Sequence, residues 1–450
     1  MRNKLMTIGS AMLLGISSAQ AAVTVEEAEK LKSVLTPFGA ERGGNADGTI
    51  PEWTGGLTEA PAGFQSGDWM PNPFADEKPL FTITASNYEQ YIDKLTPSQI
   101  DAFKRYPDQI KMNVYPTHRT AAAPDWVQEN TYNNAINASL NDAGTGANNA
   151  CGGIPFPITN NGNEMILNHN SRWKGSSLHM QYTAFQSYMH NPATTLAGES
   201  NTLWQWHYYD QNSDCSDGQL FSFFVTYNYP ARRKGEMILV NDYIDAAATP
   251  REAWQYIPGQ RRVRRAPTVA YDTPDSSIFT YDDAFLYNGS PDRYDWKVLG
   301  KKEIYIPYSG YDLASAYGKG EMKMEEAIAS DPKNLWRWEL HRVWVVEATL
   351  KEGERHIYAK RTFYLDEDTW NIALTEKYDG KGELWRYTWA NVYQAYDPAI
   401  QGSFARPIMA FDIDSGQFLW AYVDTHPLAG VEPKEKEFFT PQGIRKQARR

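Results

Sequence analysis

The sequence predicts a mainly β (α+β) protein in which a curved antiparallel sheet forms a half-open barrel, with short helices inserted between its strands. Strand-like segments follow one another from about residue 176 onward. Turn signals such as Pro258-Gly259 and Asp414-Ser415-Gly416 separate them, and successive hairpins favour an antiparallel meander. Two interruptions, near residues 280 and 325, carry helix signals instead.

The N-terminal residues are typical of an export signal. Arg2 and Lys4 precede an apolar run over residues 5–18, and Ala19-Gln20-Ala21 has the small-x-small pattern of a cleavage site. We therefore expect residues 1–21 to be a signal peptide that is cleaved after Ala21, and the mature protein to be periplasmic. No other apolar run reaches the length of a membrane-spanning helix.

Residues 22–175 are predicted to form a helix-and-loop region that packs on the sheet. Thr24 and Glu27 have the spacing of a capping box at the start of the first helix. A Thr96-Pro97 pair is a typical start for another. The expected helices cover residues 24–36, 87–94, a segment from 97, 125–140 and 163–173.

Residues 176–450 are predicted to form the half-barrel. The strongest strand predictions are residues 221–228, 236–241, 253–257, 260–265, 296–306, 336–349, 356–365, 370–378, 384–393 and 418–423. Thr280 and Asp283 have capping-box spacing before residues 284–287. Residues 321–329 are rich in strong helix formers. We expect these two segments to form the inserted helices.

The chain has two cysteines, Cys151 and Cys215. In an oxidising compartment an isolated pair is most simply a disulfide. No neighbouring ligand spacing supports a metal site or a catalytic thiol instead. We therefore predict that Cys151 and Cys215 are joined.

The strand that follows the Pro258-Gly259 turn carries four arginines. Side chains alternate between the faces of a strand, so Arg261 and Arg265 share one face while Arg262 and Arg264 share the other. An unpaired buried charge is costly. The strand is therefore a solvated edge, a ladder of ion pairs, or the rim of an anion-binding site.

The residues around this strand suggest how its charges are satisfied. Asp275, Asp282 and Asp283 follow it closely, and we expect them to pair with one arginine face. The other face is expected at the mouth of a cavity. Trp254 and Tyr256 in the preceding strand are aromatic candidates for the wall of that cavity. These two residues and the four arginines form a first set of candidate ligand-binding residues.

The strand over residues 337–349 provides a second set. One face carries Trp338, Arg342 and Trp344 among apolar residues, as expected for a core or a cavity wall. An arginine on such a face needs a buried partner. Two partners remain open, an Asp or Glu side chain and an anionic group of a ligand.

The composition limits the function. The formal net charge is −11, so nucleic acid is not an expected partner. Nucleophile-elbow, zinc-protease, phosphate-loop and Cys-x-x-Cys motifs are missing, and the eight His residues show no tight metal spacing. We predict no catalytic residues, no metal and no cofactor. The aromatic content of 14% suits an apolar cavity, or stacking on sugars, although most of these rings belong to a core.

Several long stretches are similar to one family of exported bacterial proteins. They are NADGTIPEWTGG at 45–56, VYPTHRTAAAP at 114–124, AWQYIPGQRRVRRAP at 253–267, GSPDRYDWKVLGKKEIYIPY at 289–308 and ELHRVWVVEATLKEGERHIYAKRTFYLDEDTWNIA at 339–373. These stretches are spread over nearly the whole mature chain. On them, the protein is identified as a member of the family called domain of unknown function 1329 (DUF1329).

The order of motifs also resembles the LolA/LolB-like lipoprotein carriers. A W-x-Y-x-P strand precedes the arginine strand, and the hairpin from Asp366 to Trp370 leads into Tyr378-Asp379-Gly380. The resemblance implies an incomplete antiparallel barrel around an apolar cavity that helices close. It implies a periplasmic role in shielding acyl chains from water. The resemblance to the DUF1329 family implies a membrane transporter of the resistance-nodulation-division type and an outer-membrane protein as partners.

The expected function is therefore a periplasmic binding or carrier protein for a hydrophobic, lipid-like molecule. Two alternatives from other classes remain open. One is a secreted hydrolase that acts on glycans or lipids, because a pair of carboxylates at glycosidase separation is compatible with the many Asp and Glu residues. The other is a scaffold that bridges envelope components without binding a ligand.

Overall fold

The structure is a computed structural model, and it describes residues 22–211, 215, 217–266, 271–275, 278–322 and 334–449. The predicted signal peptide lies outside these residues, as does most of the helix predicted at 321–329. Within the described part, none of the helices combines the length and the apolar character needed to cross a membrane.

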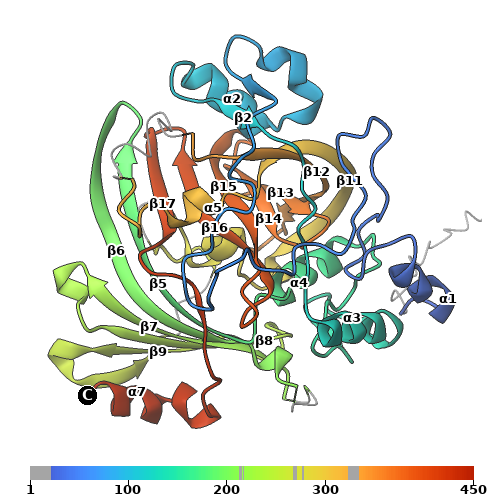
Figure 1. Cartoon of the computed structure of the whole chain (residues 1–450). Helices are drawn as coiled ribbons and strands as arrows, with labels where there is room; N and C mark the ends of the chain where they lie inside the picture. The colour runs from blue at the N-terminus through green and yellow to red at the C-terminus, as the bar shows by residue number, and fades with distance from the viewer. Residues whose placement is uncertain are drawn as a thin grey trace, which may run out of the picture.

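A curved sheet of 16 strands dominates the molecule (Figure 1). Its order is β1-β2-β12-β13-β14-β15-β16-β17-β5-β6-β7-β8-β9-β10, with β11 beside β12 and β18 beside β5. The bounds are β1 Phe81–Ile83, β2 Met112–Val114, β5 Ser177–Tyr188, β6 Asn191–Gln205, β7 Gln219–Tyr229, β8 Met237–Tyr243, β9 Glu252–Ile257, β10 Arg262–Arg265, β11 Tyr294–Pro307, β12 Trp338–Leu350, β13 Lys360–Asp366, β14 Ile372–Tyr378, β15 Leu384–Ala395, β16 Gly402–Asp412, β17 Gln417–Asp424 and β18 Ala429–Gly430. β3 (Ser139–Leu140) and β4 (Ala147–Asn148) form a separate hairpin.

The sheet consists of two meanders. β5 to β10 form the first and β11 to β17 the second, and the last strand of the second pairs with the first strand of the first, β17 with β5. No pairing among the described residues links the two ends of the strand order, so the sheet stays open. The predicted fold class, a curved antiparallel half-barrel with inserted helical segments, is confirmed.

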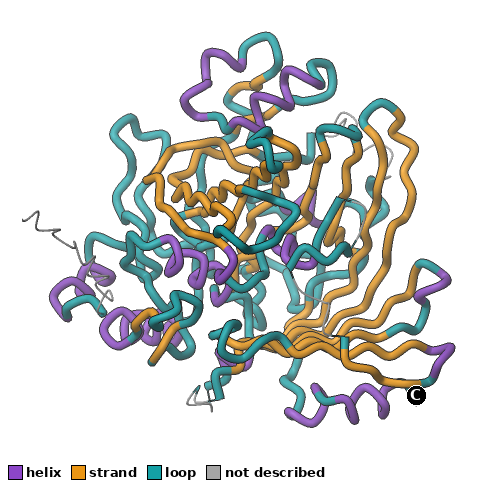
Figure 2. Tube along the Cα trace, turned by 180° about the vertical axis from the view of Figure 1, so that it is seen from behind, coloured by secondary structure: helices purple, strands orange, loops and turns teal. Residues whose placement is uncertain are grey.

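Most helices lie around the sheet, whereas α5 (Tyr311–Ser315) packs against β15, β16 and β17 (Figures 1 and 2). The α-helices are α1 Val25–Ala28, α2 Pro97–Arg105, α3 Asp125–Asn137, α4 Gly162–Ser171, α5 Tyr311–Ser315 and α7 Pro441–Gln447. The 3-10 helices are η1 Glu29–Lys32, η2 Tyr88–Lys94, η3 His207–Tyr209, η4 Ala231–Arg233, η5 Pro258–Gln260, η6 Tyr281–Leu286, η7 Pro291–Arg293 and η8 Lys436–Phe439. Thr96 and Gln99 form the capping box that starts α2.

The two faces of the first meander are covered differently. Its register places Trp204, Phe223 and Val240 side by side on one face, which we call the inner face. Leu203, Phe224 and Leu239 lie on the opposite face, where the C-terminal residues Phe439 and Ile444 pack against them. Figure 1 shows α7 running beneath β7 and β9. On the inner face, Ala266 and Tyr281 from the chain between β10 and β11 pack against Val240 and its neighbours.

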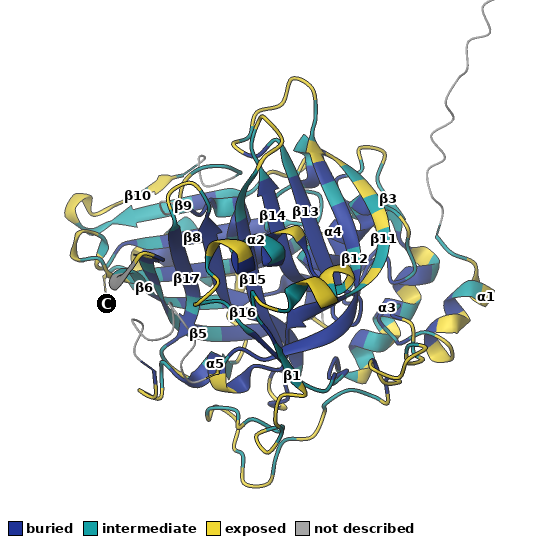
Figure 3. Cartoon of the chain, turned by 90° about the horizontal axis from the view of Figure 1, so that it is seen from above, coloured by how far each residue is buried: buried dark blue, intermediate teal, exposed yellow. Residues whose placement is uncertain are grey.

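The second meander forms the densest part of the core. Figure 3 shows β13 to β17 almost entirely as buried, with α2 lying over them. β1 and β2 extend this sheet from the N-terminal region, through one parallel bridge between Val114 and Trp338. The division into an N-terminal region, residues 22–175, and a half-barrel, residues 176–450, stays a prediction.

The strand predictions missed β5, β6 and β16 as separate strong candidates. β6 contains Gly198, Ser200 and Asn201, which have low β-propensity, so only pairing on both sides makes them a strand. β16 contains Pro407, which argues against a central strand from sequence alone. In the structure Pro407 lies where the register with β15 shifts, and a bulge is a place where a sheet accepts proline.

The predicted disulfide is confirmed. Cys151 and Cys215 are bonded, with their Cα atoms 5.6 Å apart. The bond joins the loop before α4 to the segment before β7, so it ties the helical region to the first meander.

We expect the double substitution C151S/C215S to lower the free energy of unfolding by about 4 kcal/mol, because closing a loop of this length reduces the entropy of the unfolded chain. Denaturant unfolding of oxidised wild type and the double variant measures this difference. Two titratable thiols in denatured, unreduced wild-type protein would contradict the prediction.

Candidate functional site

The segment over residues 278–290, which contains η6, lies against the inner side of both meanders, and we call it the η6 segment. Two buried acids anchor it. Asp282 accepts hydrogen bonds from both terminal nitrogens of Arg361, each at 3.0 Å, and its Oδ2 lies 3.0 Å from His356 Nε2. Asp283 lies 2.7 Å from Lys377 Nζ. These contacts bind the segment to β13 and β14.

The anchors carry compensated charge in a dry environment. Asp282, Asp283, Arg361 and Lys377 are each at most 2% exposed. Burial alone would raise the pKa of Asp282, but the charge of Arg361 and the contact with His356 hold it below the usual range. Burial lowers the pKa of Lys377, and Asp283 opposes that shift. The pairs are therefore structural ion pairs that fix the position of the η6 segment.

The backbone of the η6 segment changes direction directly after its anchors. The capping box of Thr280 and Asp283 is present as predicted. The predicted helix does not continue, because Phe285 and Leu286 adopt left-handed conformations with φ of 53° and 70°. Bulky residues at positive φ cost free energy and persist only where their surroundings impose them.

The change of direction turns Phe285 onto a group of aromatic side chains on the inner face. Its ring lies 5.2 Å from that of Trp204 and stacks on Tyr422 at 5.1 Å. Trp204 in turn stacks on Trp206 at 5.2 Å and contacts Phe223 at 4.6 Å. We call Trp204, Trp206, Phe221 and Phe223 the aromatic patch. Phe285 of the η6 segment therefore covers part of this patch.

The cavities on this side are small. One of about 120 Å³ lies between β5, β6, β17 and the start of the η6 segment, and Tyr182, Phe279 and Tyr422 line it. Ligand pockets commonly measure about 300–1,000 Å³. A hollow of about 1010 Å³ lies beside η8 and α7, but residues 434–447 alone line it, so it is a one-sided surface depression.

The predicted arginine strand lies at the end of the sheet, away from the η6 segment. β10 pairs only with β9 among the described strands, and Arg262, Arg264 and Arg265 are exposed. Arg265 lies 3.2 Å from Glu252. The expected pairing with Asp282 and Asp283 is wrong, because those acids bind Arg361 and Lys377, which the folding of β13 and β14 brings closer than the residues adjacent in sequence.

The two aromatic candidates beside this strand face the C-terminal helix. Register pairs Trp254 with Leu239 and Tyr256 with Met237, and both aromatic residues pack in the cluster that includes Phe439 and Ile444. They lie on the face opposite the aromatic patch. A ligand-binding role for Trp254, Tyr256 and the four arginines stays a prediction.

The second set of candidates lies on β12, and Arg342 has a protein partner. Its Nε donates to Glu367 Oε1 at 2.6 Å, and its Nη2 donates to the carbonyls of Glu41 and Gly43 at 3.0 and 2.7 Å. Of the two partners left open by the sequence, the structure therefore contains the acid. Trp344 lies 4.8 Å from Lys301 Nζ, and Trp338 stacks on Trp336.

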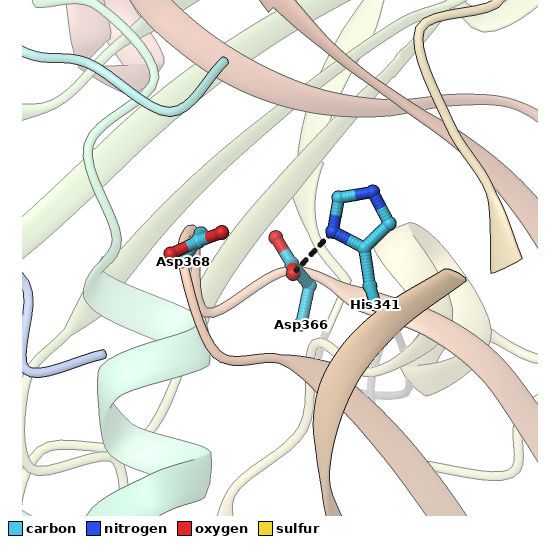
Figure 4. A group of neighbouring side chains, drawn as sticks. All are labelled: His341, Asp366 and Asp368. Carbon is cyan, nitrogen blue, oxygen red and sulfur yellow. Dashed lines mark ion pairs between the residues drawn. The ribbon is translucent and has the colours of Figure 1, made fainter. Parts of the chain in front are cut away.

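A compact group of potential metal-ligand atoms lies beside the Arg342–Glu367 pair. His341, Asp366 and Asp368 bring one atom each within 4.8 Å of one another (Figure 4). Asp368 already accepts two hydrogen bonds from Arg119, at 2.6 and 2.9 Å. The charge of this carboxylate is already compensated by the guanidinium, so the group is better described as part of an ion-pair network than as a metal centre.

Asp366 is the member of this group whose charge is least compensated. It is fully buried, its Oδ1 accepts no hydrogen bond among the described residues, and His341 Nδ1 lies 3.7 Å away. Burial, with the charge of Asp368 adding to it, raises the pKa of Asp366 to about 7. The carboxyl group therefore gives up its proton near neutral pH at a cost in stability.

We expect R361A to destabilise the protein by about 3–5 kcal/mol, because Asp282 is left as a buried charge without its main partner. R265A provides the matched control, since its side chain is 64% exposed and an exposed ion pair contributes at most about 1 kcal/mol. Denaturant unfolding of both variants tests the difference, and equal small losses would contradict the anchoring role of Arg361.

We expect D366N to stabilise the protein above neutral pH relative to wild type. The unfolded chain loses this proton near pH 4 and the folded protein near pH 7, so the stability contributed by the group is complete below about pH 4 and decreases as the pH rises to about 7. Unfolding curves between pH 4 and 8 measure the two slopes. A parallel pH dependence in both proteins would disprove the assignment.

Comparison with solved structures found distant likenesses. A putative outer membrane lipoprotein-sorting protein domain from Vibrio parahaemolyticus is 15% identical, with a TM-score of 0.43, and the match covers 63% of this chain and 97% of that one. A DUF1329 family protein from Desulfovibrio piger is 13% identical (TM-score 0.41, 60% and 92% covered). The LolA superfamily protein NE2245 from Nitrosomonas europaea is 14% identical (TM-score 0.36, 61% and 95% covered).

Sequence comparison is decisive for the family. The uncharacterized protein PA3922 of Pseudomonas aeruginosa is 44% identical over 414 residues, which are 91% of this chain and 90% of that protein. The family model described as a protein of unknown function, DUF1329, matches residues 82–445. The chain belongs to the DUF1329 family.

Proposed function

We propose that the protein is a periplasmic carrier or binding protein for a hydrophobic, lipid-like molecule. The observation that carries the proposal is the aromatic patch on the inner face, against which Phe285 of the η6 segment packs. The order of sequence motifs that resembles the LolA/LolB-like carriers supports the same function. A membrane transporter of the resistance-nodulation-division type and an outer-membrane protein are the partners that fit it.

The η6 segment has to move for an acyl chain to reach the patch, because the 120 Å³ cavity beside it is too small. Its anchors at Asp282 and Asp283 hold one end by ion pairs that are costly to break. The left-handed residues Phe285 and Leu286 lie next to those anchors. The movement we propose is a rotation at these two residues, which relieves backbone strain and uncovers Trp204.

Displacing Phe285 exposes apolar surface, and an acyl chain restores the burial. Each buried methylene group contributes about 0.8 kcal/mol, so a chain of several methylenes offsets the loss of contacts by one phenylalanine. Binding of this kind needs few polar contacts. It suits a carrier that must release its ligand as well as bind it.

The buried acids of the network do not favour the hydrolase alternative. A glycosidase pair needs two carboxyl groups on either side of a substrate. Asp282, Asp283 and Asp368 each lie within 3.3 Å of an arginine or lysine nitrogen, in fully buried positions. The scaffold alternative predicts a protein without bound lipid and is decided by the following experiment.

We expect native mass spectrometry of protein purified from its own periplasm to detect a bound lipid-like molecule. W204A should lose most of this material, because Trp204 is the centre of the aromatic patch. W254A, the matched control on the opposite face, should retain it. Retention by W204A and loss by W254A would place the site at the arginine strand instead, and wild type that is repeatedly free of lipid would refute the carrier function.

A further inference from the structure

The loop between α4 and β5 contains two buried basic side chains that have no acidic partner among the described residues. Arg172 and Lys174 are 1% and 4% exposed, and no carboxylate among the described residues forms an ion pair with either. By contrast, the buried Arg361 and Lys377, which anchor the η6 segment, both lie against acids. An uncompensated cation inside a protein is costly, so these two positions need a physical explanation.

Lys174 lies between the ring of Trp206, in the aromatic patch, and the ring of Phe285, in the η6 segment. Its Nζ is 4.8 Å from the centre of the Trp206 ring and 5.0 Å from that of Phe285. Ring faces attract a cation but do not replace its hydrogen-bond acceptors. Gly175 follows with φ of +85°, and this conformation turns the chain into β5 directly after Lys174. The side chain of Lys174 stays under Phe285 of the η6 segment.

Three donors without acceptors belong to Arg172 and to residues that contact Arg172 or Lys174. Arg172 uses Nε on Asn371 at 2.6 Å and Nη1 on the carbonyl of His169, while its Nη2 has no acceptor among the described residues. The same holds for Asn371 Nδ2 and for Trp206 Nε1. Such a surplus of donors is rare in native interiors and matches the surface that an anionic group would need.

The η6 segment contacts this cluster at two points. Phe285 covers Lys174, and the carbonyl of Tyr287 lies 3.1 Å from His169 Nε2. A rotation at Phe285 and Leu286 therefore uncovers the aromatic patch and Lys174 together. Burial lowers the pKa of Lys174, and Arg172 lowers it further, so an approaching anion would favour the charged form of the amine.

We propose that Lys174, supported by Arg172, binds the negatively charged head of an amphiphile whose chain lies on the aromatic patch, and that Phe285 covers this anchor until the ligand arrives. The proposal rests on the carrier function proposed above and adds the class of ligand, a single-chain amphiphile with an anionic head. A fatty acid carboxylate and a lysophospholipid phosphate share that chemistry.

Fluorescence titration with cis-parinaric acid and with its uncharged methyl ester tests the anchor. Wild type should bind the acid at least tenfold more tightly than the ester. K174M should lose at least tenfold in affinity for the acid and keep that for the ester, while K174R should retain most of the preference. K104M, which removes an exposed lysine of α2, should behave as wild type. Displacement by oleate or by oleoyl lysophosphatidate then shows which head group binds more tightly.

Each other outcome has a defined meaning. Binding of both probes with equal affinity, or an unchanged preference in K174M, overturns the anchor and leaves the carrier function intact. No binding of either probe refutes the carrier function itself. We expect the Tm of K174M to equal or exceed that of wild type, since an uncompensated buried amine is removed. A lower Tm with unchanged binding would show that Lys174 is purely structural.

A variant that fails to fold does not prevent the test. K174Q keeps a polar side chain of similar length and replaces K174M in the titration. In wild type, dibromostearate should quench tryptophan fluorescence at lower concentration than its methyl ester, because the anchor places the brominated chain beside Trp204 and Trp206. Equal quenching by the acid and the ester would overturn the proposal.

Discussion

The ion pairs of Asp282 and Asp283 with Arg361 and Lys377 are the contacts on which the interior depends. Two strands of the second meander supply the cations, and the chain between the two meanders supplies the acids. A buried pair adds little net stability compared with an apolar replacement, but removing one partner is costly. The network therefore fixes where the η6 segment lies, and with it what covers the inner face of the first meander.

The two faces of the first meander have different covers because different parts of the chain are available to them. The C-terminal helix packs Phe439 and Ile444 on one face, with apolar contacts that need no movement. The η6 segment covers the other face with Phe285, held by left-handed backbone and adjacent to a charged anchor. A cover that is fixed by ion pairs and has a strained backbone directly beside them is suited to local opening.

A second buried network joins the N-terminal region to the sheet. Arg119 and Arg342 both donate to the carbonyl of Glu41, and they neutralise Asp368 and Glu367. Backbone carbonyls from a loop thus complete the solvation of guanidinium groups that the sheet alone leaves unsatisfied. The two networks are alike in that buried acids and basic side chains of the sheet, Arg342 in one and Arg361 and Lys377 in the other, fix an irregular piece of chain.

The sequence by itself determined the fold class, the disulfide, the capping box at Thr280 and Asp283 and the need of Arg342 for a buried partner, because these follow from local periodicity, turn residues, cysteine number and the cost of unpaired charge. Which residues meet was decided by the tertiary structure. The acids beside the arginine strand pair with Arg361 and Lys377, Trp254 faces a helix from the far end of the chain, and Lys174 lies under Phe285. Such contacts join residues that are up to about 200 positions apart. They depend on strand order, on the face of the sheet and on register, and a local sequence pattern predicts only the structure of adjacent residues.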